Sequence, residues 1–157
     1  EIHEHFTDSF CRKQIFYLPN SWIMKEALHM VQISSQPNNI SLVEALVQKI
    51  TTGKNLSQDL HGNILVSLTE AVNNAIIHGN CCDKNKNVKI EYTERRNLLK
   101  FKVSDEGKGF NPDSIPDPTA PENIYNIGGR GVFLMRQLCD QIVFKDKGRT
   151  VEMHFNI

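Results

Sequence analysis

The sequence lacks long apolar runs and any imbalance of charge, and each absence excludes a class of protein. No apolar segment approaches the roughly 20 residues that a membrane-spanning helix requires, and the first residues lack the pattern of a secretory signal. We therefore expect a cytoplasmic protein without a membrane partner. Lys plus Arg equals Asp plus Glu at 18 each, so no general basic field draws the chain to nucleic acid.

Cysteine is also scarce, and its spacing matches neither a paired zinc motif nor a small disulfide framework. The four cysteines are Cys11, Cys81, Cys82 and Cys139. We interpret them as reduced thiols. A redox or metal-binding role for the adjacent Cys81 and Cys82 is an alternative to two small side chains after a helix. The cluster His3-Glu4-His5 provides too few ligands for a metal site.

A length of 157 residues fits one domain with its own core. Residues 1–28 mix charged, aromatic and proline residues without periodicity, and we expect an N-terminal extension of unknown role there. Clear periodicity begins close to Met30. The sequence therefore predicts that residues 29–157 form the domain.

Hydrophobic spacing predicts a strand and two helices in the first half of this domain. The run 30–33 alternates like a strand. Ser41 has the spacing of a capping box at the start of a short amphipathic helix that ends near Gly53. Ser57 is placed to cap a longer helix that Gly79 ends. The apolar stripe of that longer helix comprises Ile64, Leu65, Leu68, Val72, Ala75 and Ile76.

The second half of the domain reads as a hairpin, a helix and two more strands. The hairpin strands are 88–92 and 99–103, the helix is 132–139, and the last strands are 141–145 and 150–155. This order favours an α/β (α+β) two-layer sandwich: a mostly antiparallel mixed sheet covered on one face by three helices.

The long helix carries a polar pair opposite its apolar stripe. Glu70 and Asn74 are four residues apart, so on a helix their side chains lie one above the other and can share a target. An amide oxygen suits Mg²⁺, and a carboxylate can orient or deprotonate a hydroxyl or water. The alternative is that these residues form a solvated helix face. The apolar Ile77 on the same side of the helix argues against that alternative.

A second polar segment follows the strand 99–103. Asp105 is placed where a carboxylate can accept a hydrogen bond from an exocyclic amine. Gly107 and Gly109 allow the backbone to approach a flat base. An ordinary turn would explain the same residues, so this segment by itself leaves the question open.

A third segment, Gly129-Arg130-Gly131, opens the helix 132–139. Amides at a helix N-terminus attract phosphate, and Arg130 adds positive charge. A flexible hinge is the alternative. The Gly-Lys-Ser/Thr ending of a Walker loop is missing, which excludes a P-loop.

The three segments, in this order, resemble the N, G1 and G2 boxes of the GHKL ATPase superfamily. The matching stretches are EAVNNAIIHG at 70–79, DEGKGF at 105–110 and GRGVFLM at 129–135. Within the superfamily the sequence is most similar to the bacterial anti-sigma-factor serine/threonine kinases. The resemblance extends from about Met30 to Ile157.

The resemblance implies two cofactors, ATP and Mg²⁺, and a role for each matching residue. Glu70 would be the general base toward a serine hydroxyl of a partner protein. Asn74 would coordinate the Mg²⁺ that bridges the ATP phosphates. Asp105 would bind the adenine amine, with Gly107 and Gly109 supporting it.

At the phosphates, the same resemblance places Gly129, Arg130 and Gly131 under a short lid, and Thr150 matches a threonine near the adenine. The lid sequence between Phe110 and Gly128 contains no lysine to bind phosphate. The resemblance therefore gives more weight to Arg130 and to backbone amides.

For the whole chain, the resemblance implies an ATP-dependent protein serine/threonine kinase that acts as an anti-sigma regulatory factor. It would bind a sigma factor and phosphorylate a serine of an anti-anti-sigma (STAS-type) protein, as a homodimer. The alternative is a non-catalytic nucleotide-responsive partner-binding module. The ATP-binding half of a histidine kinase fits less well, because the sequence shows no long dimerisation helix with a phosphoacceptor histidine.

Overall fold

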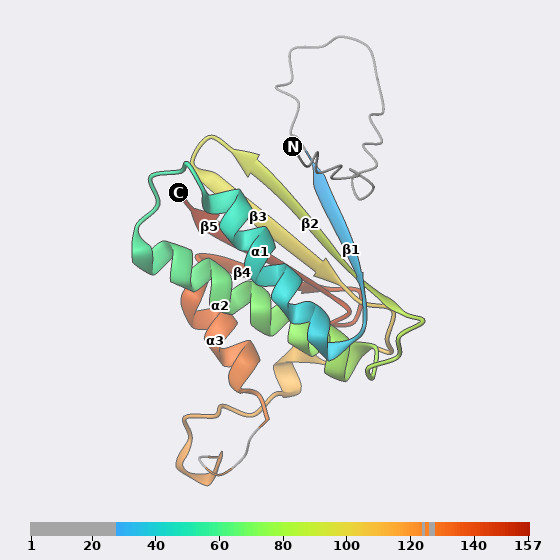
Figure 1. Cartoon of the computed structure of the whole chain (residues 1–157). Helices are drawn as coiled ribbons and strands as arrows, with labels where there is room; N and C mark the ends of the chain where they lie inside the picture. The colour runs from blue at the N-terminus through green and yellow to red at the C-terminus, as the bar shows by residue number, and fades with distance from the viewer. Residues whose placement is uncertain (1–27, 124, 126–127) are drawn as a thin grey trace, which may run out of the picture.

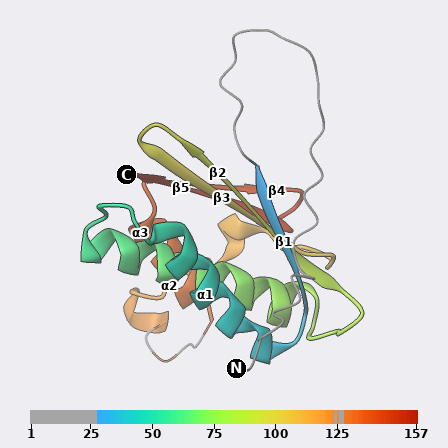
Figure 2. The same ribbon diagram turned by 45° about the horizontal axis from the view of Figure 1, so that its top comes forward.

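The fold is a two-layer sandwich of one sheet and three helices. The structure is a computed structural model that describes residues 28–123, 125 and 128–157. All three helices cover the same face of the sheet (Figure 1), and the turned view in Figure 2 shows the same two layers. The predicted fold class is confirmed. The predicted extension, apart from Leu28, lies outside the described residues.

The sheet has five strands in the order β1-β2-β3-β5-β4, and every neighbouring pair is antiparallel. The strands are β1 (His29–Ser34), β2 (Asn87–Arg95), β3 (Leu98–Ser104), β4 (Gln141–Lys145) and β5 (Thr150–Asn156). Each contains a strand that the periodicity predicts. The pairing of β3 with β5 brings the residues after the hairpin beside the last turn of the chain.

Helix α1 (Ile40–Thr51) forms where predicted but begins differently. The capping box at Ser41 is wrong: a 3₁₀ turn at Pro37–Asn39 runs into the helix, and Asn39 occupies the N-cap position without a side-chain cap. The Ser41 hydroxyl donates to the Asn38 carbonyl at 3.1 Å. Proline at the start of that turn already has a helical φ, so the helix begins before Ser41.

Helix α2 (Gln58–Asn74) starts as predicted, with the Ser57 hydroxyl accepting a hydrogen bond from the Leu60 N–H at 3.1 Å. Its end is more elaborate than a glycine stop. The helix widens into a π turn, η2 (Ala75–Gly79), and the Asn80 N–H bonds the Ala75 carbonyl at 2.8 Å. Such a turn shifts the side chains that follow relative to a continuous α-helix.

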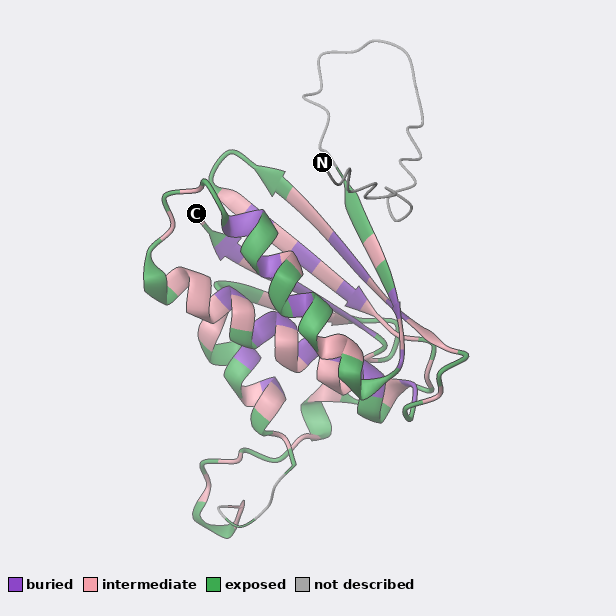
Figure 3. Ribbon diagram, in the orientation of Figure 1, coloured by how far each residue is buried: buried purple, intermediate pink, exposed green. Residues whose placement is uncertain are grey.

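The core lies between the helices and the sheet, and Figure 3 shows buried residues both on the helices and on the strands that they cover. Alternate residues of the central strands point inward, including Phe101 and Phe155, whose rings meet edge to face with centroids 6.1 Å apart. From α2, Leu68 and Val72 are fully buried. Burial of such side chains contributes about 1.5–3 kcal/mol each, so this layer contact fixes α2 on the sheet.

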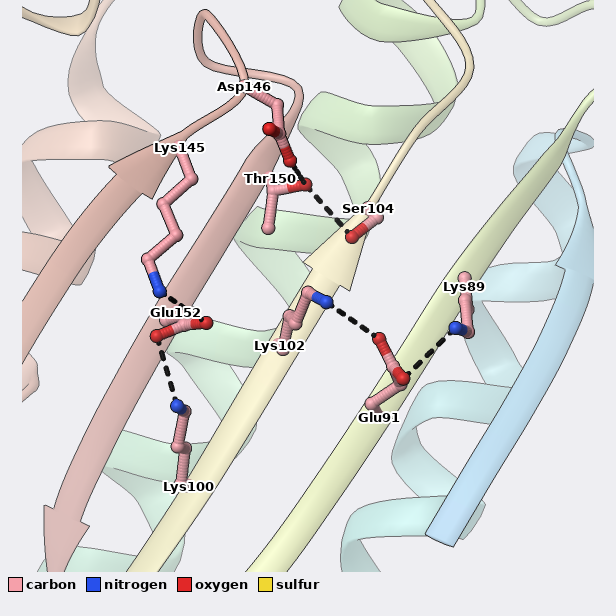
Figure 4. A network of polar contacts seen from close by, with 9 residues as sticks. All are labelled: Lys89, Glu91, Lys100, Lys102, Ser104, Lys145, Asp146, Thr150 and Glu152. Atoms are coloured by element: carbon pink, nitrogen blue, oxygen red, sulfur yellow. Dashed lines mark hydrogen bonds and ion pairs between the residues drawn. The ribbon is translucent and has the colours of Figure 1, made fainter. Parts of the chain in front are cut away.

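The opposite face of the sheet carries a network of ion pairs (Figure 4). Two nearly buried glutamates each contact two lysines: Glu91 contacts Lys89 and Lys102, and Glu152 contacts Lys100 and Lys145. Burial alone would raise the pKa of both carboxyls, but the paired lysines outweigh it and lower the pKa of each.

The segment between β3 and helix α3 (Arg130–Leu138) contains two short 3₁₀ turns, η3 (Pro112–Ser114) and η4 (Pro121–Asn123). Its prolines exclude long regular elements. In Figure 1 it extends beyond the N-terminal end of α3. It therefore leaves and rejoins the body of the molecule beside the C-terminal end of α2.

Candidate nucleotide-binding site

A cavity of about 650 Å³ opens between α2, the start of α3 and the sheet. Its walls come from all three predicted segments. Among the predicted site residues, the structure brings together in this lining Asn74, Asp105, Gly109, Gly129 and Gly131. Three segments separated in sequence thus converge on one pocket.

The polar pair of α2 faces the first turn of α3. A Cβ added to Gly131 would collide with the Glu70 carboxylate and lie 3.4 Å from the Asn74 amide nitrogen. Both side chains are partly buried. They are therefore packed against α3, Asn74 in the cavity lining and Glu70 just outside it, which argues against a solvated helix face. A side chain at position 131 would have to displace the Glu70 carboxylate from this position.

Asp105 is held by backbone groups on either side. Its N–H donates to the Arg149 carbonyl at 3.0 Å, and its carboxylate accepts a hydrogen bond from the Gly107 N–H at 2.7 Å. A Cβ added at Gly79 would lie 2.5 Å from the carboxyl carbon. The end of η2 therefore packs directly against this carboxylate. Gly107 supports Asp105 without lining the cavity.

The surroundings of Asp105 change its acidity. Burial raises the pKa of this carboxyl above its ordinary value of 3.8, and the Gly107 amide, Arg149 and Lys86 offset only part of that effect. A desolvated carboxylate in a cleft is a strong hydrogen-bond acceptor. A ligand amine in the cavity would donate the hydrogen bond that an exposed carboxylate accepts from water.

The third segment provides a helix N-terminus at the cavity. Gly129 is the N-cap of α3 with a left-handed φ of 84°, a conformation that favours glycine. Gly128, Gly129 and Gly131 line the cavity, so backbone is exposed to it there. Arg130 is not part of the lining.

Thr150 is not brought to the cavity. Its hydroxyl lies 3.0 Å from the Ser104 hydroxyl and donates to the Asp146 carboxylate at 3.1 Å, on the face of the sheet without helices (Figure 4). Its neighbours Arg149 and Val151 line the cavity instead. Successive side chains of a strand point to opposite faces of the sheet, so Thr150 points away from the cavity that its two neighbours line.

Sequence reasoning missed the apolar part of the lining and one buried amide. Ile115 and Met135 contribute apolar surface, and Phe110 and Phe144 meet edge to face with ring centroids 5.8 Å apart. Asn80, which is fully buried, bonds the loop after Asp105. The position of Asn80 directly after Gly79, the last residue of the first matching segment, is the sequence signal that could have indicated its role.

The described cysteines lie outside the cavity lining. Cys81 and Cys82 are exposed in a turn where both have left-handed φ, whereas burial raises the pKa of the Cys139 thiol to about 11. Within the described residues, no three His, Cys, Asp or Glu side chains form a group that could hold a metal ion. Cys11 and the His3-Glu4-His5 cluster lie outside those residues.

The residues present fit ATP and Mg²⁺. The cavity volume lies in the range of about 300–1,000 Å³ typical of small-molecule sites. It combines an apolar wall for a flat base, a desolvated carboxylate and a glycine-rich helix N-terminus for phosphate. The Asn74 side chain offers one oxygen ligand, which suits an ion that takes most of its ligands from water and phosphate.

The chain belongs to the family of the histidine kinase-like ATPase domain. The family model matches residues 33–155, which contain the whole cavity lining. Membership in this ATP-binding family implies that the chain uses ATP.

Curated relatives named serine-protein kinase RsbW are similar over most of the chain. The relative from Bacillus licheniformis is 27% identical over 139 residues, covering 83% of this chain and 87% of its own. The relative from Bacillus subtilis (strain 168) is 26% identical over 130 residues, covering 78% and 81%. That from Listeria monocytogenes serovar 1/2a is 24% identical over 130 residues, covering 78% and 83%. These names support a kinase activity in general terms.

In the part of the chain that the structure describes, no helix combines the length and apolar character needed to cross a bilayer.

Proposed function

We propose that this chain is a Mg²⁺-dependent protein serine/threonine kinase that acts as an anti-sigma regulatory factor. It binds a sigma factor and transfers the γ-phosphate of ATP to a serine of an anti-anti-sigma (STAS-type) protein. The observation that carries the proposal is the position of Glu70. This carboxylate lies one helical turn before Asn74 and against Gly131 in the first turn of α3, beside the cavity that Asn74, Gly131 and Asp105 line.

Asp105 anchors the base end of the nucleotide. Its carboxylate accepts a hydrogen bond from the exocyclic amine of adenine, and its orientation is set by the Gly107 amide. The apolar wall around Ile115 and Met135 covers the face of the base and excludes water. This arrangement orients the phosphates toward α3.

The start of α3 and the end of α2 bind the phosphates. The amides beside Gly129 and Gly131 point outward at a helix N-terminus, where the dipole favours negative charge. Arg130 adds positive charge, and Asn74 holds the magnesium ion. When bound, Mg²⁺ supplies neutralisation of the phosphate charge, which is a principal requirement of phosphoryl transfer.

Glu70 acts on the attacking group. In this role the carboxylate accepts the proton of the partner serine hydroxyl and orients its oxygen. The glycine at position 131 allows the carboxylate to lie against the first turn of α3. The serine must come from another protein, so the cavity mouth near α3 forms part of the docking surface. We further propose a cytoplasmic homodimer.

The test is phosphoryl transfer from labelled ATP in the presence of Mg²⁺, with candidate STAS-type proteins of the same genome as acceptors. Wild type is compared with Glu70→Gln and Asp105→Asn. We expect Glu70→Gln to bind ATP normally and to reduce transfer about 10²–10⁴-fold, the usual contribution of a general base. Asp105→Asn should lose nucleotide.

Other outcomes separate the alternatives. If the wild type binds ATP and the sigma factor but transfers no phosphate, the chain is a nucleotide-responsive binding module. An unchanged rate of phosphoryl transfer in Glu70→Gln would mean that another group acts as the general base. Failure to bind the sigma factor while transfer persists would retain the kinase and remove the anti-sigma role.

A further inference from the structure

Asn80 lies at the point where α2 and η2 end, and its side chain is fully buried. A buried amide requires partners for two N–H donors and one carbonyl oxygen. All of these capacities are used. The three partners come from three parts of the chain that are distant in sequence.

The Asn80 amide nitrogen donates to the Ser35 hydroxyl at 2.7 Å and to the Asn87 carbonyl at 2.9 Å. These groups lie just after β1 and at the first residue of β2. The Asn80 side-chain oxygen accepts a hydrogen bond from the Glu106 N–H at 2.8 Å. The Asn80 side chain thus joins the end of α2 and η2 to two strand ends and to the loop that follows β3.

The contact with Glu106 acts directly on the base anchor. Glu106 separates Asp105 from Gly107, whose amide donates to the Asp105 carboxylate. A Cβ added at Gly107 would collide with the Gly79 carbonyl, so the loop is also packed tightly on the residue before Asn80. Fixing the Glu106 N–H therefore fixes both ends of this short turn.

We propose that Asn80 is a positioning residue for nucleotide recognition, and this role rests on the proposed ATP site. It holds the Asp105 turn in register with the helix that carries Glu70 and Asn74. Through Asp105 it sets affinity for the base, whereas the phosphate groups bind at Gly129 and Gly131 without its help.

The experiment compares the affinities of ATP and of inorganic tripolyphosphate, both with Mg²⁺, by titration calorimetry on the full chain. Tripolyphosphate carries the phosphates but no base. We expect Asn80→Ala to weaken ATP binding about tenfold, the effect of losing one well-placed hydrogen bond. Tripolyphosphate affinity should change less than about twofold. The ratio of the two affinities is independent of the fraction of folded protein.

Two variants separate positioning from stability. Asn80→Asp keeps an oxygen facing the Glu106 N–H, so it should restore the affinity ratio to within about threefold of wild type. Val47→Ala removes apolar volume from a fully buried site on α1 that does not line the cavity. It should lower the unfolding midpoint and leave the ratio unchanged.

Amide hydrogen exchange of Glu106 in the free protein measures the contact without nucleotide. Faster exchange in Asn80→Ala than in Val47→Ala is expected. If Asn80→Ala binds both ligands equally less well, or if Asn80→Asp is as impaired as Asn80→Ala, the positioning role is wrong. A wild type that binds no ATP would instead overturn the proposed site, whatever the exchange of Glu106 shows.

Discussion

At the scale of single residues, Asp105 combines a functional and an energetic property. Burial raises the pKa of its carboxyl, so the folded state disfavours the charged form. Stability from such a group is fully present below the unfolded pKa and is lost as the pH rises through the higher folded pKa. Binding of a base, in contrast, requires the charged form as an acceptor.

We predict that Asp105→Asn separates these two properties. The neutral amide avoids the cost of burying a charge, so the free energy of unfolding at neutral pH should be equal to or above that of wild type. ATP affinity should fall by at least about tenfold, because the amide cannot match the carboxylate as an acceptor. Chemical denaturation and calorimetric titration measure the two effects. A variant that lost both ATP affinity and stability would contradict this account of Asp105.

The same residue predicts how ATP binding depends on pH. As the pH falls through the raised pKa, the Asp105 carboxyl gains a proton and becomes a poorer acceptor. Wild-type affinity for ATP should therefore decline at a pH above the ordinary value of 3.8 for an aspartate. The control is Asp105→Asn, whose weak affinity should show no such step in the same range.

At the scale of elements, the approach of α3 to α2 depends on the absence of a side chain at Gly131. We predict that Gly131→Ala weakens Mg²⁺-dependent ATP binding about tenfold or more, because the added methyl group pushes the Glu70 carboxylate toward Asn74, the proposed Mg²⁺ ligand, which lies beside the same methyl group. The free energy of unfolding should fall little, since alanine favours the helix by about 1 kcal/mol. Titration calorimetry and denaturation measure both.

The matched control is Gly62→Ala in α2, where an added Cβ meets no atom within 4 Å. It gains the same helix propensity without touching the cavity, and its ATP affinity should equal that of wild type. Equal affinities in the two variants would show that Gly131 has no special role in the site.

The outer face of the sheet predicts a second effect at this scale. The pKa of Glu152 is lowered, so its contribution to stability is present above the ordinary value of 4.5 and is lost as the pH falls through the folded pKa. Glu152→Gln should reduce the free energy of unfolding by about 1 kcal/mol at neutral pH, a modest value because its two lysines are partly exposed.

Denaturation across a pH series and at high salt tests this prediction. The difference from wild type should disappear below the folded pKa and shrink in salt, which screens exposed charges. The exposed Glu44→Gln is the control and should change stability little at any pH. A difference that persisted unchanged in acid would mean that Glu152 acts through packing and not through charge.

Local pattern predicted the elements well and the directions of some side chains poorly. The five strands and three α-helices of the described residues follow from periodicity, whereas the 3₁₀ turns and the π turn do not. The cavity forms where three glycine-containing segments end or begin an element. The Thr150 role came from the resemblance alone, and its side chain points away from the cavity because it alternates with Val151, which lines it. The role of Asn80 was not predicted because its partners Ser35 and Glu106 are 45 and 26 residues away in the sequence. Contacts of that kind leave no periodic signal in the sequence.

At the scale of the whole molecule, the described residues share one core, and this predicts where the domain begins. We expect a chain that starts at His29 to keep the free energy of unfolding within about 1 kcal/mol of the full chain, and to keep ATP affinity within about twofold. The reason is that β1 begins at His29, the family match begins at residue 33, and every predicted site residue lies later. Denaturation and calorimetric titration of both chains provide the measurement.

A chain that starts at Ser35 is the informative comparison, because it lacks β1 and with it the buried Ile33. It leaves β2 as an unpaired edge and should lose about 2 kcal/mol or more, through lost apolar burial and lost strand pairing. It retains Ser35 and hence the hydroxyl that Asn80 bonds, so any loss of ATP affinity would come from stability and not from that contact. If the chain from His29 were as unstable as the chain from Ser35, residues 1–28 would belong to the folded unit, and the boundary predicted from the sequence would be wrong.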